Sequence, residues 1–221
     1  MRIDRRCVRA FATAALVAVL LSMLAPAARG QQLLEDFFIA VANDRSGEVK
    51  SLLARGIDPN SVDRNGDPAL VTAARAGNAA TLDILLAAGA AVNAPNRFGD
   101  TALMIAALGG HFDLVRKLRA RGADFNRPGW TALIYAATGG HDEIVRYLLA
   151  EGADIDAVSP NGTTALMMAA RGGRLSTVDL LIARGASVSH RNDSGASALD
   201  WAKRAKETVL AERLRRAGAR D

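Results

Sequence analysis

Apolar and small residues recur along the chain with a period close to 33 residues. Each copy contains a three-residue phrase ending in Ala-Leu, with a glycine two residues before the phrase and another nineteen residues after its leucine. Successive leucines are 33, 30, 33 and 33 residues apart; they are Leu70, Leu103, Leu133, Leu166 and Leu199. Such self-similarity at a fixed period predicts a stack of structural repeats.

Each copy carries the signals of two short helices. Hydroxyl residues before most of the Ala-Leu pairs can accept hydrogen bonds from the free N–H groups of a helix start; they are Thr101, Thr131, Thr164 and Ser197. Paired alanines follow in the first helix, larger aliphatic residues fill the second, and a glycine follows each helix. Phe37 and Gly56 continue the series upstream as a degenerate first unit.

The predicted fold is all-α, a solenoid of about six helix-turn-helix units joined by β-hairpin-like loops. We expect a targeting segment at residues 1–30 and a repeat domain at 31–221. The expected units are 33–62, 63–95, 96–126, 127–158, 159–191 and 192–221.

The repeats resemble those of the ankyrin family. The resemblance is clearest in Gly-Asp-Thr-Ala-Leu…Gly-Gly-His…Gly-Ala-Asp-Phe-Asn at 99–126 and in Gly-Trp-Thr-Ala-Leu…Gly-Gly-His…Gly-Ala-Asp-Ile-Asp at 129–156. The chain has Ala where that family usually has Pro after the Thr, and it lacks the family His after the Leu. The 30-residue interval places a three-residue deletion between Gly122 and Gly129, which should shorten one hairpin tip.

The N-terminus has the three parts of a secretory signal. Four arginines precede an apolar run from Ala10 to Ala25, and small residues follow it, so cleavage could come after Ala27 or after Gly30. The run of about 16 residues is shorter than the roughly 20 that a membrane-spanning helix needs, although an uncleaved anchor is the alternative. The pair Arg5-Arg6 leaves the twin-arginine route open beside the ordinary secretory one.

Cysteine and charge narrow the class of protein. Cys7 is the single cysteine and lies ahead of the apolar run, so a processed chain would contain no disulfide. The formal net charge of +5 is concentrated at the N-terminus, because residues 1–27 hold four arginines against Asp4. The rest of the chain carries 24 basic and 22 acidic residues, a balance that does not favour nucleic-acid binding.

The family resemblance implies that hairpin tips and the exposed side of each first helix contact a partner protein. Carried over position by position, the candidate partner-binding residues are Arg64, Asn65, Arg75, Arg97, Phe98, Asp100, Leu108, Trp130, Thr138, Asn161 and Arg171. Phe98 and Trp130 stand out, because aromatic side chains often dominate binding energy. The alternative is that both rings pack against neighbouring tips.

One apolar stripe is expected to be structural. Ile105, Tyr135, Met168 and Trp201 occupy matching repeat positions, two residues after the phrase leucine. We expect this stripe to form core between repeats rather than a ligand groove.

Enzymatic signatures are missing from the sequence. His111 and His141 share one repeat position and are expected to be structural, and His190 is expected to be solvated or to contact a partner. No set of residues has zinc or calcium spacing, and no nucleophile elbow or phosphate-binding loop occurs.

The sequence therefore predicts a non-catalytic scaffold without a cofactor, metal or small-molecule substrate. We expect a monomer in the bacterial periplasm, or secreted, that binds another protein and stabilises or inhibits it. The alternative is an envelope-associated protein held in the inner membrane by an uncleaved N-terminus.

Overall fold

The computed structural model describes residues 30–220, and the predicted targeting segment lies almost entirely outside them. Residues 30–42 are helical, and eleven labelled helices follow. Their bounds are α2 Ser46–Ala54, α3 Ala69–Ala76, α4 Ala79–Ala87, α5 Ala102–Gly109, α6 Phe112–Ala120, α7 Ala132–Gly139, α8 Asp142–Ala150, α9 Ala165–Arg171, α10 Leu175–Ala183, α11 Ala198–Arg204 and α12 Thr208–Arg216. Within residues 30–220, none of these helices is both long and apolar enough to cross a membrane.

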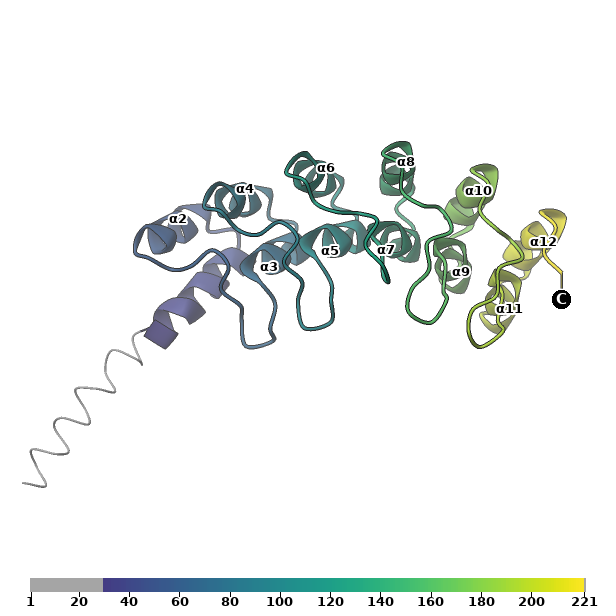
Figure 1. The fold of residues 1–221 in the computed structure, drawn as a ribbon, viewed down its shortest axis with the longest axis horizontal. Helices are drawn as coiled ribbons and strands as arrows, with labels where there is room; N and C mark the ends of the chain where they lie inside the picture. Colours follow the sequence, from purple (N-terminus) through teal and green to yellow (C-terminus); the bar gives the residue numbers. More distant parts are fainter. Residues whose placement is uncertain (1–29, 221) are drawn as a thin grey trace, which may run out of the picture.

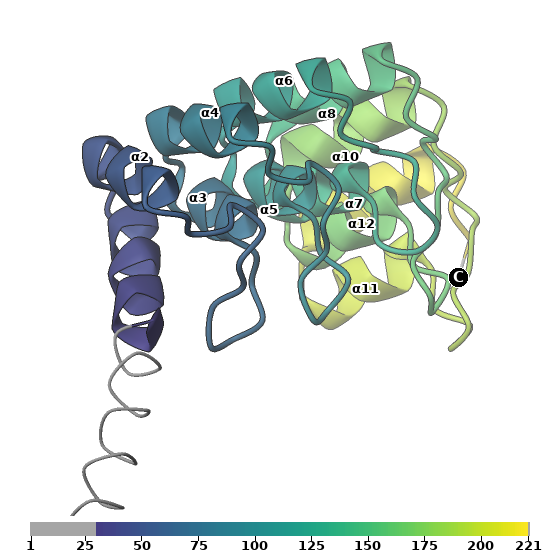
Figure 2. The same ribbon diagram turned by 60° about the vertical axis from the view of Figure 1, so that its left-hand side comes forward.

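The helices form two layers of an elongated, curved array (Figure 1). The odd-numbered helices from α3 to α11 pack against one another as the inner layer, and the even-numbered helices form the outer layer. Loops project from the inner layer as a row of fingers, which Figure 2 shows from the side. The predicted all-α solenoid is confirmed.

Small residues let the inner helices approach closely. The paired alanines of each first helix are completely buried; they are Ala73, Ala74, Ala106, Ala107, Ala136, Ala137, Ala169 and Ala170. The outer helices supply the larger core side chains, such as Leu82, Leu118 and Leu148. Each unit therefore buries its apolar face only by stacking on its neighbours.

Three of the four predicted hydroxyl caps form, whereas the Thr101 hydroxyl before α5 is buried without a hydrogen-bond partner among the described residues. The hydroxyls of Thr131, Thr164 and Ser197 accept hydrogen bonds from backbone N–H groups in the first turn. Gly110 ends α5 with a φ of +75°, and a Cβ there would lie 2.5 Å from the ring of His141. This glycine is thus required both by the turn and by the close approach of the next unit.

Four fingers share one internal hydrogen bond. In each, the backbone N–H of a residue that we call the anchor donates to the carbonyl of the residue four positions later. Asn96 N–H, for example, donates to the carbonyl of Asp100 at 2.9 Å. The anchors Asp63, Asn96, Ser159 and Asn192 also accept N–H groups of their own fingers through side-chain oxygens. Within the described chain, only Val62 and Pro68 form a β-bridge, so the fingers are turns rather than strands.

The loop between α6 and α7 lacks this pattern. The three-residue deletion removes the anchor position. Asn126 belongs instead to a series of asparagines that bond one repeat to the next, and its Oδ1 accepts from Asp154 N–H at 3.2 Å. We call this series the ladder between repeats. Asn93 plays the same ladder role one unit earlier, where it accepts from Asp124 N–H. The predicted shortening is therefore a lost finger in the middle of the row.

Candidate functional site

The fingers and the inner helices together form the face that carries the candidate residues (Figure 1). Two repeat positions on the inner helices point to this face, two and five residues after the phrase leucine. The first position is Thr72, Ile105, Tyr135, Met168 and Trp201. The second is Arg75, Leu108, Thr138, Arg171 and Arg204.

An open groove of about 610 Å³ lies between the second and third units. It brings together six of the residues that the sequence predicted, namely Asn65, Arg75, Arg97, Phe98, Asp100 and Leu108. Ile105 and Tyr135 complete its wall. Both were expected to be only inter-repeat core; they do pack on the core, but their outer surfaces line the groove.

Phe98 is the most exposed large apolar side chain of this groove, with 70% of its surface accessible. The guanidinium of Arg97 lies 4.7 Å from the centre of its ring. The backbone N–H of Phe98 donates to Asn96 Oδ1 at 2.9 Å, which fixes the finger that carries the ring. The alternative that Phe98 packs against a neighbouring tip is wrong.

An internal ion pair neutralises the basic side of the groove. Arg75 Nη2 lies 2.6 Å from Asp67 Oδ2, and Asn96 Nδ2 donates to the other oxygen of Asp67 at 2.8 Å. The residue Asp67 is only 9% exposed. Three residues from two fingers and one helix thus form a fixed polar triplet, with the Asp67 carboxylate at its centre.

A second polar contact joins the third and fourth units. The hydroxyl of Tyr135 donates to Asp100 Oδ1 at 2.5 Å. Burial, followed by this hydrogen bond and the nearby negative charge, raises the pKa of Tyr135 well above its usual range. The phenol stays protonated and holds the finger of the third unit against α7.

Trp130 occupies a different position from the one predicted. Because its finger is missing, Trp130 does not stand at an extended tip; it is half-buried, packs against the core and lies 5.8 Å from Tyr135 between ring centres. These contacts support the alternative that the Trp130 ring packs within the protein. Thr138 is also half-buried, and its hydroxyl donates to Ile134 O at 2.7 Å.

A second groove, of about 550 Å³, lies between the fifth and sixth units. It contains the predicted residues Asn161 and Arg171, together with Trp201 and Arg204. The guanidinium of Arg171 lies 5.5 Å from the centre of the Trp201 ring. Arg204 was missed by the sequence analysis, although it continues the repeat series of Arg75 and Arg171 and could have been found from it.

Arg64 lies apart from the other candidates. It pairs with Glu35 and lines a third concavity near the first helix, of about 530 Å³, with Phe38, Ile39 and Val62. Ile39 and Val62 are each half-exposed.

The histidines bond or pack against backbone rather than against carboxylates. His141 Nε2 lies 2.9 Å from Leu108 O, and the ring of His111 lies against Gly77. His190 Nε2 lies 2.8 Å from Gly162 O and links the last two fingers. Its side chain remains partly exposed, so solvation or a partner contact of His190 stays a prediction. Within residues 30–220, no group of three His, Cys, Asp or Glu residues could hold a metal ion.

Comparisons with known proteins agree with the repeat pattern. A family model described as ankyrin repeats (3 copies) matches residues 37–128, 98–159, 126–192 and 153–218. The crystal structure of the human ASB11 ankyrin repeat domain superposes with a TM-score of 0.75 at 30% sequence identity, covering 83% of this chain and 84% of that chain. A comparison with curated proteins found no match.

Proposed function

The chain belongs to the ankyrin-repeat family, and from that premise we propose that it is an exported scaffold that binds one partner protein through its finger face. Ankyrin repeats generally bind proteins and are typically non-catalytic. The observation that carries the proposal is the groove at Phe98, because it gathers six candidate contacts from two adjacent units.

The chemistry of this groove suits a protein surface. An exposed aromatic ring beside Ile105 and Leu108 offers apolar area, and the bonded polar groups of Asp67, Arg75 and Asn96 line the same groove. Protein interfaces commonly combine such an apolar centre with a polar rim. Fixed fingers also reduce the conformational entropy that binding would cost.

Site-specific photocrosslinking tests the binding face. A photoreactive amino acid at position 98 should capture one dominant protein in cells. The same group at Val209, which is 58% exposed on α12, should not capture it. Equal capture from both positions, or none from position 98, would contradict the assignment.

Export to the bacterial periplasm is part of the proposal and rests on the sequence of residues 1–30. The mass of the mature chain tests it: a chain starting at residue 28 or 31 supports export with cleavage. An intact Met1 in the membrane fraction supports the alternative, an anchored envelope protein. In the anchored form the finger face would still bind, but near the membrane.

A further inference from the structure

The position five residues after the phrase leucine is arginine in three units, but the arginines have different surroundings. Arg75 has the carboxylate of Asp67 at 2.6 Å. Asp67 directly follows Gly66, the glycine of its finger, so the equivalent residue in each other unit directly follows the matching glycine. In the fifth and sixth units that residue is Thr163 and Ala196, so neither supplies a carboxylate.

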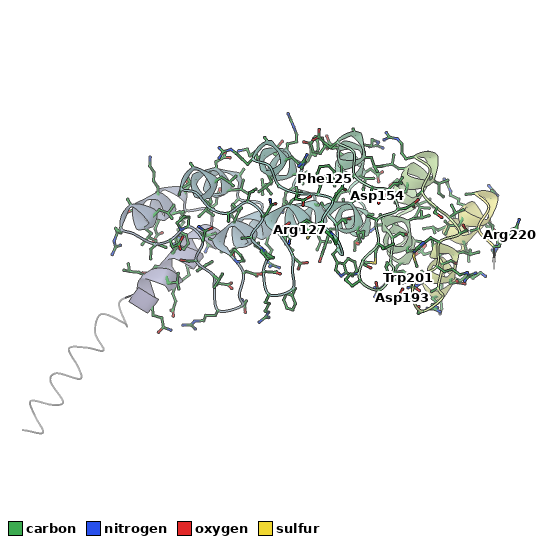
Figure 3. All side chains as sticks on the ribbon, in the orientation of Figure 1. Phe125, Arg127, Asp154, Asp193, Trp201 and Arg220 are labelled. Carbon is green, nitrogen blue, oxygen red and sulfur yellow. The ribbon has the colours of Figure 1, made fainter. Side chains whose placement is uncertain are left out.

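Arg171 and Arg204 therefore face the second groove without an ion pair to any described residue. Both are exposed, and the guanidinium of Arg171 lies over the ring of Trp201, 5.5 Å from its centre. The residues that line the second groove include no Asp or Glu. Asp200 bonds to Ser197 and Arg191, and Asp193 is not among the residues that line the groove. Figure 3 labels Asp193 and Trp201 toward the C-terminal end of the array.

The third member of the triplet is also present. Asn192 lines the second groove at the repeat position of Asn96, whose Nδ2 donates to Asp67 in the first groove. The Oδ1 of Asn192 accepts the N–H groups of Ser194 and Ala196, so its finger is fixed in the same way as that of Asn96. Arginine and asparagine thus repeat the arrangement, and only the carboxylate is missing.

The walls of the second groove are rigid. Asp193 N–H donates to Asn161 O at 3.2 Å, and His190 Nε2 lies 2.8 Å from Gly162 O. The fingers of the fifth and sixth units are therefore bonded to each other. The fingers that border the groove are thus held together, and the two arginine charges attract carboxylates through charge-assisted hydrogen bonds.

We propose that the second groove binds an acidic segment of the partner protein, whose carboxylates take the place at Arg171 and Arg204 that Asp67 takes at Arg75. This inference rests on the proposed binding function and adds the chemistry of the ligand. The two arginines stand one repeat apart, roughly 10 Å for packed helices. An extended chain advances roughly 3.3 Å per residue, so the segment carries acidic residues three positions apart.

Fluorescence anisotropy with the full processed chain and a labelled peptide tests the proposal. The probe is an extended Ser/Gly peptide with two glutamates three residues apart, and its control has glutamine at both positions. Binding should need the glutamates. It should weaken at least tenfold in the double variant Arg171→Gln/Arg204→Gln and remain unchanged in Arg146→Gln/Arg184→Gln, which removes two exposed arginines from the outer layer.

A gain-of-carboxylate variant gives the sharper test. Thr163→Asp should complete the triplet with Arg171 and Asn192 from within the chain and so compete with the peptide. Circular dichroism and the urea midpoint show whether this variant is folded, and the double arginine variant tests the same groove independently.

Three results would overturn the proposal. They are no binding of the glutamate peptide, equal weakening by both double variants, and binding of a single-stranded oligonucleotide of equal charge as tight as that of the peptide. Because the peptide is added directly, a failed capture at Phe98 leaves this test intact. Capture at Phe98 without peptide binding would refute only the acidic-segment inference.

Discussion

The hydrogen bond from Tyr135 to Asp100 links two units beside the missing finger, and Tyr135→Phe removes it with little other change. A hydrogen bond to a charged group contributes about 1.5–3 kcal/mol. Because Tyr135 is only half-buried and Asp100 is not fully buried, we expect a value at or slightly below the lower end of this range, about 1–2 kcal/mol. With a urea dependence of about 2 kcal/mol per molar, the unfolding midpoint should fall by about 0.5–1 M.

Urea unfolding followed by circular dichroism measures this change, and Tyr147→Phe is the matched control. The ring of Tyr147 packs edge-on against Phe112, and no hydrogen bond of its hydroxyl is seen among the described residues. The control should shift the midpoint by less than about 0.2 M, since surface changes usually stay within about 0.5 kcal/mol. Equal midpoints for Tyr135→Phe and the parent would refute the link between the units.

The pH dependence of the same pair of proteins gives a second readout. The pKa of Tyr135 is higher in the folded chain than in the unfolded one. The stability it contributes is therefore complete below about pH 10, the usual tyrosine pKa, and is lost as the pH rises further. The stability difference between parent and Tyr135→Phe should stay constant from pH 7 to 9 and shrink above pH 10.

Two further changes test the cap of the last unit and the repeat core. The backbone N–H of Ser197, and then its hydroxyl and the charge of Arg191, lower the pKa of Asp200, so its stabilising contribution is present above about pH 4 and lost in more acidic solution. Thermal melts of Asp200→Asn should show a loss of about 1 kcal/mol at pH 7 that shrinks as the pH falls below about 4; a constant loss would contradict the charged cap. Leu133→Ala, at a residue 1% exposed in the central unit, should cost about 2–5 kcal/mol in urea unfolding. Leu108→Ala, at a residue 38% exposed, should cost less than about 1 kcal/mol, and equal costs would contradict the assigned faces.

The repeat fold was readable from sequence because every signal recurs. One Thr, one Ala-Leu pair or one glycine would be weak evidence, but the same physical requirement appears in each unit. Thr131 and Thr164 cap helices because each repeat meets the same orphan N–H groups. The deletion between Gly122 and Gly129 was equally visible, as a change in spacing.

The site was only partly readable, because contacts between units do not follow from position alone. Trp130 and Phe98 both belong to tip segments, yet the deletion draws Trp130 back onto Tyr135 and leaves Phe98 exposed. Whether an arginine is paired also depends on a residue eight positions earlier, as Arg75 and Asp67 show. Arg171 therefore differs from Arg75 in having no acidic partner. The sequence alone did not reveal this difference, because the Arg75–Asp67 ion pair is visible only in the structure.

The central claim is tested most directly with the protein that photocrosslinking at position 98 captures. Its affinity is measured for the parent chain and for the Phe98→Ala variant. About 70% of the surface of Phe98 is accessible, and burying about 140 Å² of aromatic surface corresponds to about 3.5 kcal/mol. Binding should be weaker by about 300-fold, because each 1.4 kcal/mol is about a factor of ten, and this loss lies within the range of interface hot spots. Val209→Ala should leave the affinity unchanged. An unchanged affinity for Phe98→Ala, or an equal loss in both variants, would contradict the claim that the finger face holds the partner.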